Sequence, residues 1–377
     1  MNQTVLNKLT LLRQELHRYP ELSGEEKSTA KKIIAFFEPL NMDEMIYPLG
    51  GEGVAFVYDG QEDGPTTLIR CELDGLPIFE DNDVSYKSNF SGRSHTCGHD
   101  GHMAIVCGVG LALAEGRPKK GRVTLLFQPA EETGEGAKKI LEDAKFSLIK
   151  PDYAFALHNL PGDALNDIIF KDGAFAAASR GLEIQLMGRT SHAAYPEDGN
   201  SPADAMSKII LGLQKLPKSL DGFSMVTVVN AVLGEISFGT TPGQATIRAT
   251  LRAYEDKVMD QLVLQSEELV AEIASRYNIS FTFNYTECFN STANHPEASA
   301  YMGNAALILN LKTSHRKVPF RWSEDFGQFS QVTKTGFFGI GAGLDHAQLH
   351  ESVYDFPDEI IPTGVEMFMA IIKQINY

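Results

Sequence analysis

Short apolar runs alternate with helical patterns along the first part of the chain. Leucines recur at helical spacing before Pro20, and a second apolar series, Ile33, Ile34 and Phe37, follows it. Because proline interrupts a helix, this pattern predicts two helices within residues 1–40. Apolar runs predict strands at 53–60, 66–75, 122–128 and 153–157, and helical patterns lie at 103–115 and 134–144. This alternation is typical of an α/β layer structure with a mostly parallel sheet.

The pattern changes after Gly181. The predicted elements that follow are a strand at 182–188, a helix at 201–216, extended segments at 225–238 and 244–254, a helix at 258–277 and a strand at 279–287. The order β-α-β-β-α-β is that of a ferredoxin-like unit. From about Asn290 the chain returns to α/β character. We therefore predict a catalytic domain of residues 1–179 and 290–377, and an inserted domain of residues 180–289.

Composition narrows the function classes. The 377 residues carry 33 Lys and Arg against 49 Asp and Glu, a formal charge of −16, which argues against a broad nucleic-acid surface. No run reaches the roughly 18 apolar residues of a membrane span, and the N-terminus lacks the features of a secretory signal. The four cysteines show no disulfide spacing, as expected in a reducing compartment. We expect a cytoplasmic protein that binds neither nucleic acid nor membrane.

The densest chemical signal is SHTCGHDGHM at 94–103. It gathers His95, Cys97, His99, Asp100 and His102 directly before an apolar helix. In an extended segment, side chains two positions apart face the same side, so Cys97 and His99 are expected to converge on one metal. Thiolate and imidazole suit zinc and similar transition metals. The alternative is a polar loop with structural histidines.

A second signal is FQPAEETGEG at 127–136, where Glu131 and Glu132 follow a buried strand and precede a helix. The carboxyl ends of strands are where α/β sheets build their sites. Adjacent side chains point in different directions, so one carboxylate is free to bind metal while the other acts as a base. Acidic residues also favour helix N-termini for dipole reasons alone, and that interpretation stays open.

Further candidates lie at other predicted strand ends: His158, Asp74, and the pair His346 and His350. Each is weak alone, but together with the two dense motifs they supply enough ligands for two metal ions in one site. G-x-S-x-G, Walker and G-x-G-x-x-G motifs are absent from the sequence, which excludes serine-nucleophile, kinase and dinucleotide readings. We interpret GVG at 108–110 as close helix packing.

Six ordered motifs give the chain a family resemblance. It resembles the aminoacylase-like metallopeptidases, and among them the amidohydrolase branch of hippurate hydrolases, N-acyl-amino-acid amidohydrolases, N-acetyldiaminopimelate deacetylases and auxin-conjugate hydrolases. The resemblance covers nearly the whole chain. Beside a similar N-terminal segment, LRQELHRYPELSGEE, the matching motifs are HTCGHDGHM, FQPAEETGEGAKKI, ALHNLPG, GRTSHAAYPEDGNSPADA, RWSEDFGQF and LHES.

The resemblance implies a zinc-peptidase-like catalytic domain and an inserted domain that serves as lid and dimerisation unit. Two divalent ions per subunit (Zn, Mn, Co or Ni) would be bound by Cys97, His99, Glu132, His158 and His350. Glu131 would be the general acid and base, and His192 of the inserted domain would stabilise the oxyanion, in many relatives across a dimer interface. Asp74, Asp100 and Arg252 are expected beside the ligands or the substrate, and Arg252 could equally be a surface arginine.

Two departures from the family pattern concern specificity. Relatives usually read N-V-I-P where this chain reads GTTP at 239–242, so Gly239 replaces an asparagine that often contacts substrate. The motif R-A-D-M-D-A-L-P reads RCELDGLP here, with Glu72 for the first aspartate. We predict hydrolysis of N-acyl, chiefly N-acetyl, amino acids by a homodimer or larger homo-oligomer. A dipeptidase or aminopeptidase, or an inactive metal-binding module, remains the alternative.

Overall fold

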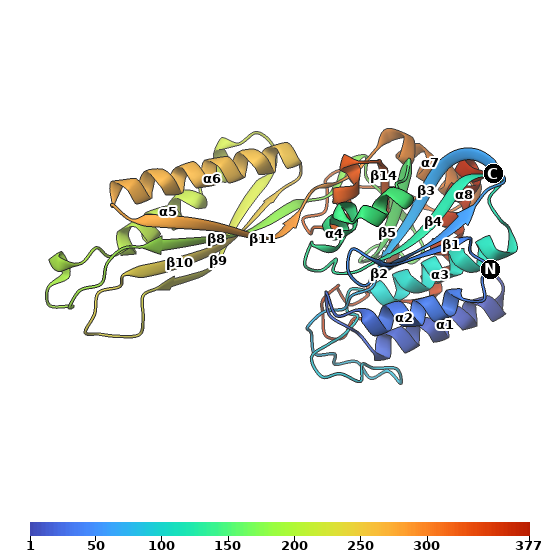
Figure 1. Cartoon of the computed structure of the whole chain (residues 1–377), viewed down its shortest axis with the longest axis horizontal. Helices are drawn as coiled ribbons and strands as arrows, with labels where there is room; N and C mark the ends of the chain where they lie inside the picture. Colours follow the sequence, from blue (N-terminus) through green and yellow to red (C-terminus); the bar gives the residue numbers. More distant parts are fainter. The chain divides into compact units, whose positions relative to one another are not determined.

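The computed structural model describes residues 1–377 and divides into two compact units (Figure 1). Unit 1 contains Met1–Phe175, Thr292–Pro319 and Glu324–Tyr377. Unit 2 contains Ala176–Ser291 and Phe320–Ser323. None of the helices combines the length and the apolar character that crossing a bilayer requires.

Unit 1 is built on an eight-stranded sheet in the order β1-β2-β4-β3-β5-β14-β6-β13. Its strands are β1 Glu44–Leu49, β2 Gly53–Asp59, β3 Glu62–Glu72, β4 Lys120–Gln128, β5 Tyr153–Pro161, β6 Ile168–Phe170, β13 Thr313–His315 and β14 Lys334–Gly343. The central strands β4, β3, β5 and β14 are parallel. Strands β1 and β2 pair antiparallel, and β6 pairs antiparallel with β14 and parallel with β13. A separate pair joins β7 Gly173–Ala176 to β12 Thr292–Asn294. The α/β prediction is confirmed for this unit.

Helices cover the sheet. They are α1 Gln3–Arg18, α2 Lys27–Phe37, α3 His99–Glu115, α4 Gly136–Glu142, α7 Pro296–Ile308 and α8 Ile361–Asn376. Helices α3 and α8 pack against β3 and against each other, and α1 packs on α3 (Figure 1). Helix α3 is apolar on nearly all sides, as a helix between two layers must be. A β carbon at Gly108 would lie 2.5 Å from Val365, and one at Gly110 2.5 Å from Phe37, which confirms close packing at this GVG segment.

Unit 2 has the predicted ferredoxin-like order. Its elements are β8 Ala178–Met187, α5 Ala203–Leu213, β9 Ser224–Leu233, β10 Gln244–Ala253, α6 Asp256–Arg276 and β11 Ser280–Phe289. The four strands form an antiparallel sheet in the order β11-β8-β10-β9. Burial alternates along β10, and the inward residues pack with α5 and α6 into a core of their own.

The unit boundaries differ by a few residues from the predicted 180–289. Unit 2 begins at Ala176 and ends at Ser291, and it also takes in Phe320–Ser323. This short segment joins because the amide of Ala177 donates to the carbonyl of Trp322, and Ala176 forms a bridge with Phe320. Backbone pairing over so few residues leaves no periodicity in the sequence.

Candidate metal centre and active site

The carboxyl ends of β4, β3, β5 and β14 meet at one edge of the unit 1 sheet. The loop after β3 carries Asp74 and leads to Cys97 and His99, and the turn after β4 carries Glu131 and Glu132. His158 lies within β5, three residues before its end, and His350 follows β14. The unit 1 candidates therefore come from four separate strand ends of one sheet, as open α/β folds favour.

Cys97, His99 and His158 form one cluster of potential ligand atoms, all within 4.8 Å of one another. The Cys97 Sγ lies 3.5 Å from the His158 Nε2. His99 Nδ1 bonds the carbonyl of Asp74 at 2.9 Å, and His158 Nδ1 bonds that of Asn159 at 2.8 Å. Because a carbonyl only accepts, each Nδ1 carries the proton of the neutral ring, and Nε2 is then the nitrogen with the lone pair that a metal ligand needs.

The expectation that Cys97 and His99 converge through an extended backbone was wrong. Gly98 adopts a left-handed conformation with φ of 89°, and His99 is the first residue of α3. The tight turn at Gly98 brings the two side chains together instead. A β carbon at Gly98 would lie 2.4 Å from the Asn159 side-chain amide nitrogen. Both the left-handed backbone and this close contact therefore require glycine here.

Glu132 links this cluster to a second one. Cys97, Glu132 and His350 group within the same limit, as do His99, Glu131 and Glu132. The Glu132 carboxylate lies 3.8 Å from both the His99 Nε2 and the His350 Nε2. His350 has a positive φ of 68°, a conformation that non-glycine residues adopt mainly where function or packing demands it.

Two buried atoms of the expected ligands lack any hydrogen-bond partner: His99 Nε2 and Glu132 Oε1. Buried polar atoms are nearly always paired, so these atoms indicate a ligand-binding position. The donor set of one thiolate, three imidazoles and one carboxylate is that of a divalent transition-metal site. The residues present therefore fit bound metal ions.

The electrostatics of the edge favour a cation. Burial opposes a charge on His99, but Asp74 and the nearby carboxylates outweigh it and raise its pKa to about 10. Burial raises the pKa of Glu132 to about 7, and burial with Glu324, Glu132 and Asp325 raises the pKa of Glu131 well above its usual value. One guanidinium, that of Arg70, pairs with Glu72, Glu324 and Asp325, while the carboxylates of Asp74, Glu131 and Glu132 lie beside His99. The excess negative charge is what bound divalent cations would balance.

Asp74 supports the site without joining a ligand cluster. Its carboxylate lies 3.4 Å from the His99 Nδ1 and accepts hydrogen bonds from the Glu132 amide at 3.0 Å and the Ser23 hydroxyl at 2.7 Å. It thereby orients one expected ligand through its ring and another through its backbone. Such supporting hydrogen bonds fix ligand geometry.

Glu72, the residue that departs from the family pattern, is completely buried. Its carboxylate bonds Arg70 and the His102 Nδ1, the latter at 2.7 Å. The His102 Nε2 accepts from the Asn159 side chain at 3.0 Å, so both ring nitrogens are in use. His102 therefore packs behind His158, at a centroid distance of 4.8 Å, and supports it rather than offering a lone pair.

Arg70, Glu324 and Asp325 were not singled out from the sequence. Arg70 contacts both acids at 2.9 and 2.6 Å, and the Asp325 amide donates to the Glu131 Oε1 at 3.3 Å. This arrangement fixes the carboxylate of Glu131 from behind. The signal was the pair of adjacent acids in the RWSEDFGQF motif, since acids at buried positions need a partner.

Asp100 points away from the ligand atoms. Its carboxylate lies 2.8 Å from the His17 Nδ1 and 3.5 Å from Arg13, both on α1 and both buried. Burial opposes the His17 charge, but Asp100 and Glu80 raise its pKa to about 9. The N-terminal motif LRQELHRYPELSGEE thus supplies an ion-pair network under the site.

The remaining histidines of the motifs lie outside the ligand clusters. His95 is buried with neither ring nitrogen hydrogen-bonded, and burial lowers its pKa to about 4. His346 bonds the carbonyl of Ala347 at 3.1 Å, and its ring lies tilted against Tyr354 at a centroid distance of 5.3 Å.

His192 and Arg252 lie in unit 2. The His192 ring is exposed, and its Nδ1 accepts from the Ala194 amide at 3.0 Å, which leaves the Nε2 as the protonated nitrogen of the neutral ring. Its backbone forms a bridge with Thr240, beside Gly239. Arg252 donates to the Arg321 carbonyl at 2.7 Å and contacts the Ser323 hydroxyl at 3.0 Å.

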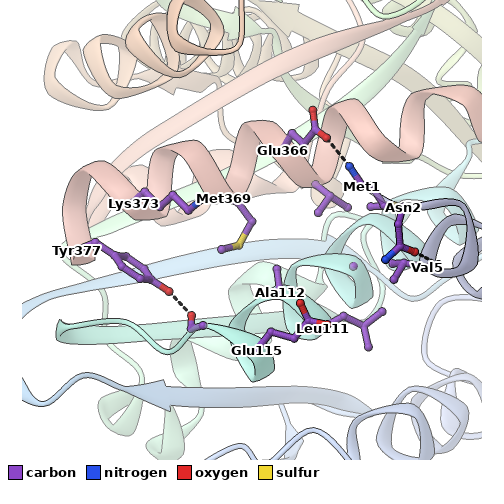
Figure 2. A pocket seen from close by; sticks show the side chains of 13 residues that line it. Met1, Asn2, Val5, Leu111, Ala112, Glu115, Glu366, Met369, Lys373 and Tyr377 are labelled. Carbon is purple, nitrogen blue, oxygen red and sulfur yellow. Dashed lines mark hydrogen bonds and ion pairs between the residues drawn. The ribbon is translucent and has the colours of Figure 1, made fainter.

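A separate cavity of about 480 Å³ lies between α1, α3 and α8 (Figure 2). It is lined by apolar side chains such as Val5, Leu111 and Met369, with the amine of Met1 bonded to Glu366 at its rim. None of its lining residues belongs to a ligand cluster. This cavity is therefore distinct from the candidate metal centre.

Comparison with known proteins gives consistent matches. Residues 68–374 match the model of peptidase family M20/M25/M40. N-acetylcysteine deacetylase of Bacillus subtilis is 30% identical over 368 residues, which cover 97% of this chain and 96% of that protein. Hippurate hydrolase of Campylobacter jejuni is 30% identical over 366 residues, which cover 96% and 94%.

Solved structures agree. The crystal structure of a Bacillus subtilis protein described as a dinuclear metal-binding peptidase of the M20 family superposes with a TM-score of 0.84 at 27% identity, covering 98% of each chain. A family match over most of the length, with relatives aligned almost end to end, confirms the resemblance drawn from the motifs: the chain belongs to peptidase family M20/M25/M40.

Proposed function

We propose that this protein is a dinuclear metal-dependent amidohydrolase that removes the acyl group from a small N-acyl amino acid. The reaction class agrees with the family and with its deacetylase and hippurate hydrolase relatives. The observation that carries the proposal is the convergence of the five expected ligand side chains at one sheet edge, with Glu131 beside them.

Cys97, His99, Glu132, His158 and His350 would hold the two ions. Cys97 belongs to two of the three-residue clusters, one with His99 and His158 and the other with Glu132 and His350, so it would be a candidate ligand for both ions. Zn, Mn, Co or Ni suits this donor set better than Mg, which prefers oxygen ligands. When bound, such ions acidify a water and polarise the scissile carbonyl.

Glu131 would move the proton from the attacking water to the leaving amine nitrogen. Its carboxylate is buried, one oxygen is held by the Asp325 amide, and the other lies 3.8 Å from His99. The neighbouring acids favour its protonated form, which suits a group that must release a proton to the amine.

Unit 2 would complete the site. His192 presents an exposed Nε2–H that is able to donate to an oxyanion. Arg252 would bind the substrate carboxylate, although two of its contacts are to unit 2 itself. We keep both roles as proposals, together with that of unit 2 as lid and dimerisation domain.

We also propose a homodimer formed through unit 2. Strand β9 is an edge of the four-stranded sheet, and Val229, Val232 and Leu233 on it are exposed. Unpaired edges with apolar side chains favour pairing with another chain. Light scattering should give a dimer mass for the wild type and a monomer mass for Val232→Lys. A monomeric wild type would refute this proposal.

The function is tested with protein reconstituted with each metal in turn. Rates are compared on N-acetyl amino acids, N-benzoylglycine and unblocked dipeptides. We expect turnover of the acylated substrates that chelation abolishes and metal restores. Faster cleavage of dipeptides would favour the peptidase alternative, and stoichiometric metal without any turnover would favour an inactive binding module.

A cytoplasmic location stays a prediction, with which the four free cysteines agree.

A further inference from the structure

The loop between α1 and α2 lies against the turn that carries Glu131 and Glu132. Ser23 donates to Asp74, and the Glu26 carboxylate accepts from the backbone amide of Ala130 at 2.7 Å. Residues 23–26 thus contact the turn after β4 directly and the loop after β3 as well. Neither Ser23 nor Glu26 belongs to a ligand cluster.

Glu26 is unusual for its position. It is the N-cap residue of α2, where a side chain normally bonds the free amides of the first turn, yet it makes no such bond. Its Oε1 accepts instead from Gly24 at 2.9 Å and from Ala130. The side chain is fully buried, and its Oε2 has no partner.

Ala130 needs this support because its backbone is strained. Its φ of 52° places an L-residue in the left-handed region, a conformation that is unfavourable for residues with a β carbon. Its carbonyl accepts from the Gly136 amide at 3.0 Å, so Glu26 and Gly136 hold the two peptide groups on either side of the Ala130 α carbon. The direction of the chain at Ala130 decides where the next two side chains point.

Burying Glu26 there opposes folding. Burial and the nearby Asp74 raise the pKa of Glu26 to about 7, so near neutral pH its ionised form is costly. No lysine or arginine contacts it. A residue that only stabilised the fold would be better apolar or exposed, so the hydrogen bond to the turn is the feature that accounts for it.

We propose that Glu26 is a positioning residue, whose carboxylate holds Ala130 in the left-handed conformation that separates the directions of Glu131 and Glu132. This inference rests on the roles proposed above for those two glutamates. Glu26 acts through the Ala130 amide as a hydrogen-bond acceptor, and its charge is not required.

The test compares Glu26→Ala with Glu26→Gln in the full chain. Glutamine keeps an oxygen for the amides of Gly24 and Ala130 and removes the charge, whereas alanine removes the acceptor. Glu25→Ala is the matched control, because Glu25 is exposed and pairs only with Arg93 at the surface. Each variant is loaded with Co²⁺, and its visible absorption spectrum, metal stoichiometry and kcat are measured.

We expect Glu26→Ala to change the cobalt spectrum and to lower kcat about 10–100-fold, the usual effect of losing a group that orients metal ligands. Glu26→Gln and Glu25→Ala should match the wild type in cobalt spectrum and in kcat. An unchanged spectrum and kcat in Glu26→Ala, with only a lower melting temperature, would overturn the proposal. So would equal losses in the alanine and glutamine variants, since the charge would then be the essential feature.

The cobalt spectrum separates this inference from the proposed function. If the wild type turns over no acylated amino acid, yet Glu26→Ala alters the spectrum and Glu26→Gln does not, the positioning role stands and the amidohydrolase assignment fails. If turnover is present and the spectra of all variants agree, the positioning role fails alone.

Discussion

Replacing Glu131 with glutamine separates proton transfer from metal binding. Glutamine keeps an oxygen for the Asp325 amide, which lies 3.3 Å from the Glu131 Oε1, but it does not take up a proton near neutral pH. We expect turnover to fall by about 10²–10⁴-fold, which corresponds to about 3–5 kcal/mol of barrier. Metal stoichiometry should be unchanged, because all five expected ligands are intact.

The stability of the same variant provides a control. Burial and the acids around Glu131 raise its pKa, so its ionised form destabilises the folded state above the ordinary glutamate pKa. The metal-free glutamine variant should therefore unfold at an equal or higher temperature than the metal-free wild type. A large fall in melting temperature would mean that lost activity reflects misfolding.

Glu132→Gln is the paired experiment. The Glu132 carboxylate lies 3.8 Å from the Nε2 atoms of His99 and His350, so its loss should weaken metal binding, and excess metal should partly restore turnover. Metal content by mass spectrometry and kcat by amine release are measured for both variants. If Glu131→Gln loses metal while Glu132→Gln keeps it and is inactive, the two roles are reversed and the reasoning fails.

Three further outcomes follow from single contacts. Cys97→Ala should lose metal and activity together, and a full metal complement in this variant would exclude the thiolate as a ligand. Gly136→Ala should lower the free energy of unfolding in urea by at least about 2 kcal/mol, because its β carbon would lie 1.6 Å from the Pro129 carbonyl oxygen. Its control, Gly303→Ala, lies in an open helical position and should be neutral or stabilising. The pKa of His17 is raised from 6.5 to about 9, so its stabilisation is complete below about pH 6.5 and is lost as pH rises through 9. Between neutral pH and about pH 10, His17→Asn should lose less unfolding free energy in urea than the wild type. An equal loss in the two proteins would contradict the raised pKa of His17.

Much of the fold was predictable because its elements carry strong periodic patterns. The β-α-β-β-α-β order of unit 2 could be predicted because strands such as β10 alternate and helices such as α6 have one apolar face. The start of α3 could not, since His99 and Asp100 are polar and give no apolar period, yet α3 begins at His99. The helical turn there is fixed by Gly98 and by buried partners from distant segments.

The expected ligands could be proposed because metal chemistry restricts the residue types. The supporting residues could not be assigned, because their partners are far away in the sequence. Arg13 reaches Asp355 and Asp358, and Arg70 reaches Asp325. Nothing local to an arginine reveals which distant acid will neutralise it once both are buried.

These long-range pairs also explain why a metal centre of this kind needs so large a scaffold. The expected ligands come from four separate strand ends, and carbonyl or carboxylate groups behind His99, Glu132 and His158 fix the directions of these three. The acids that orient the ligands also raise the negative charge of the edge, so the metal-free fold contains repulsion that bound cations would relieve. Affinity for metal and orientation of the proton-transfer group thus share one physical origin, the crowding of carboxylates around a single arginine, Arg70.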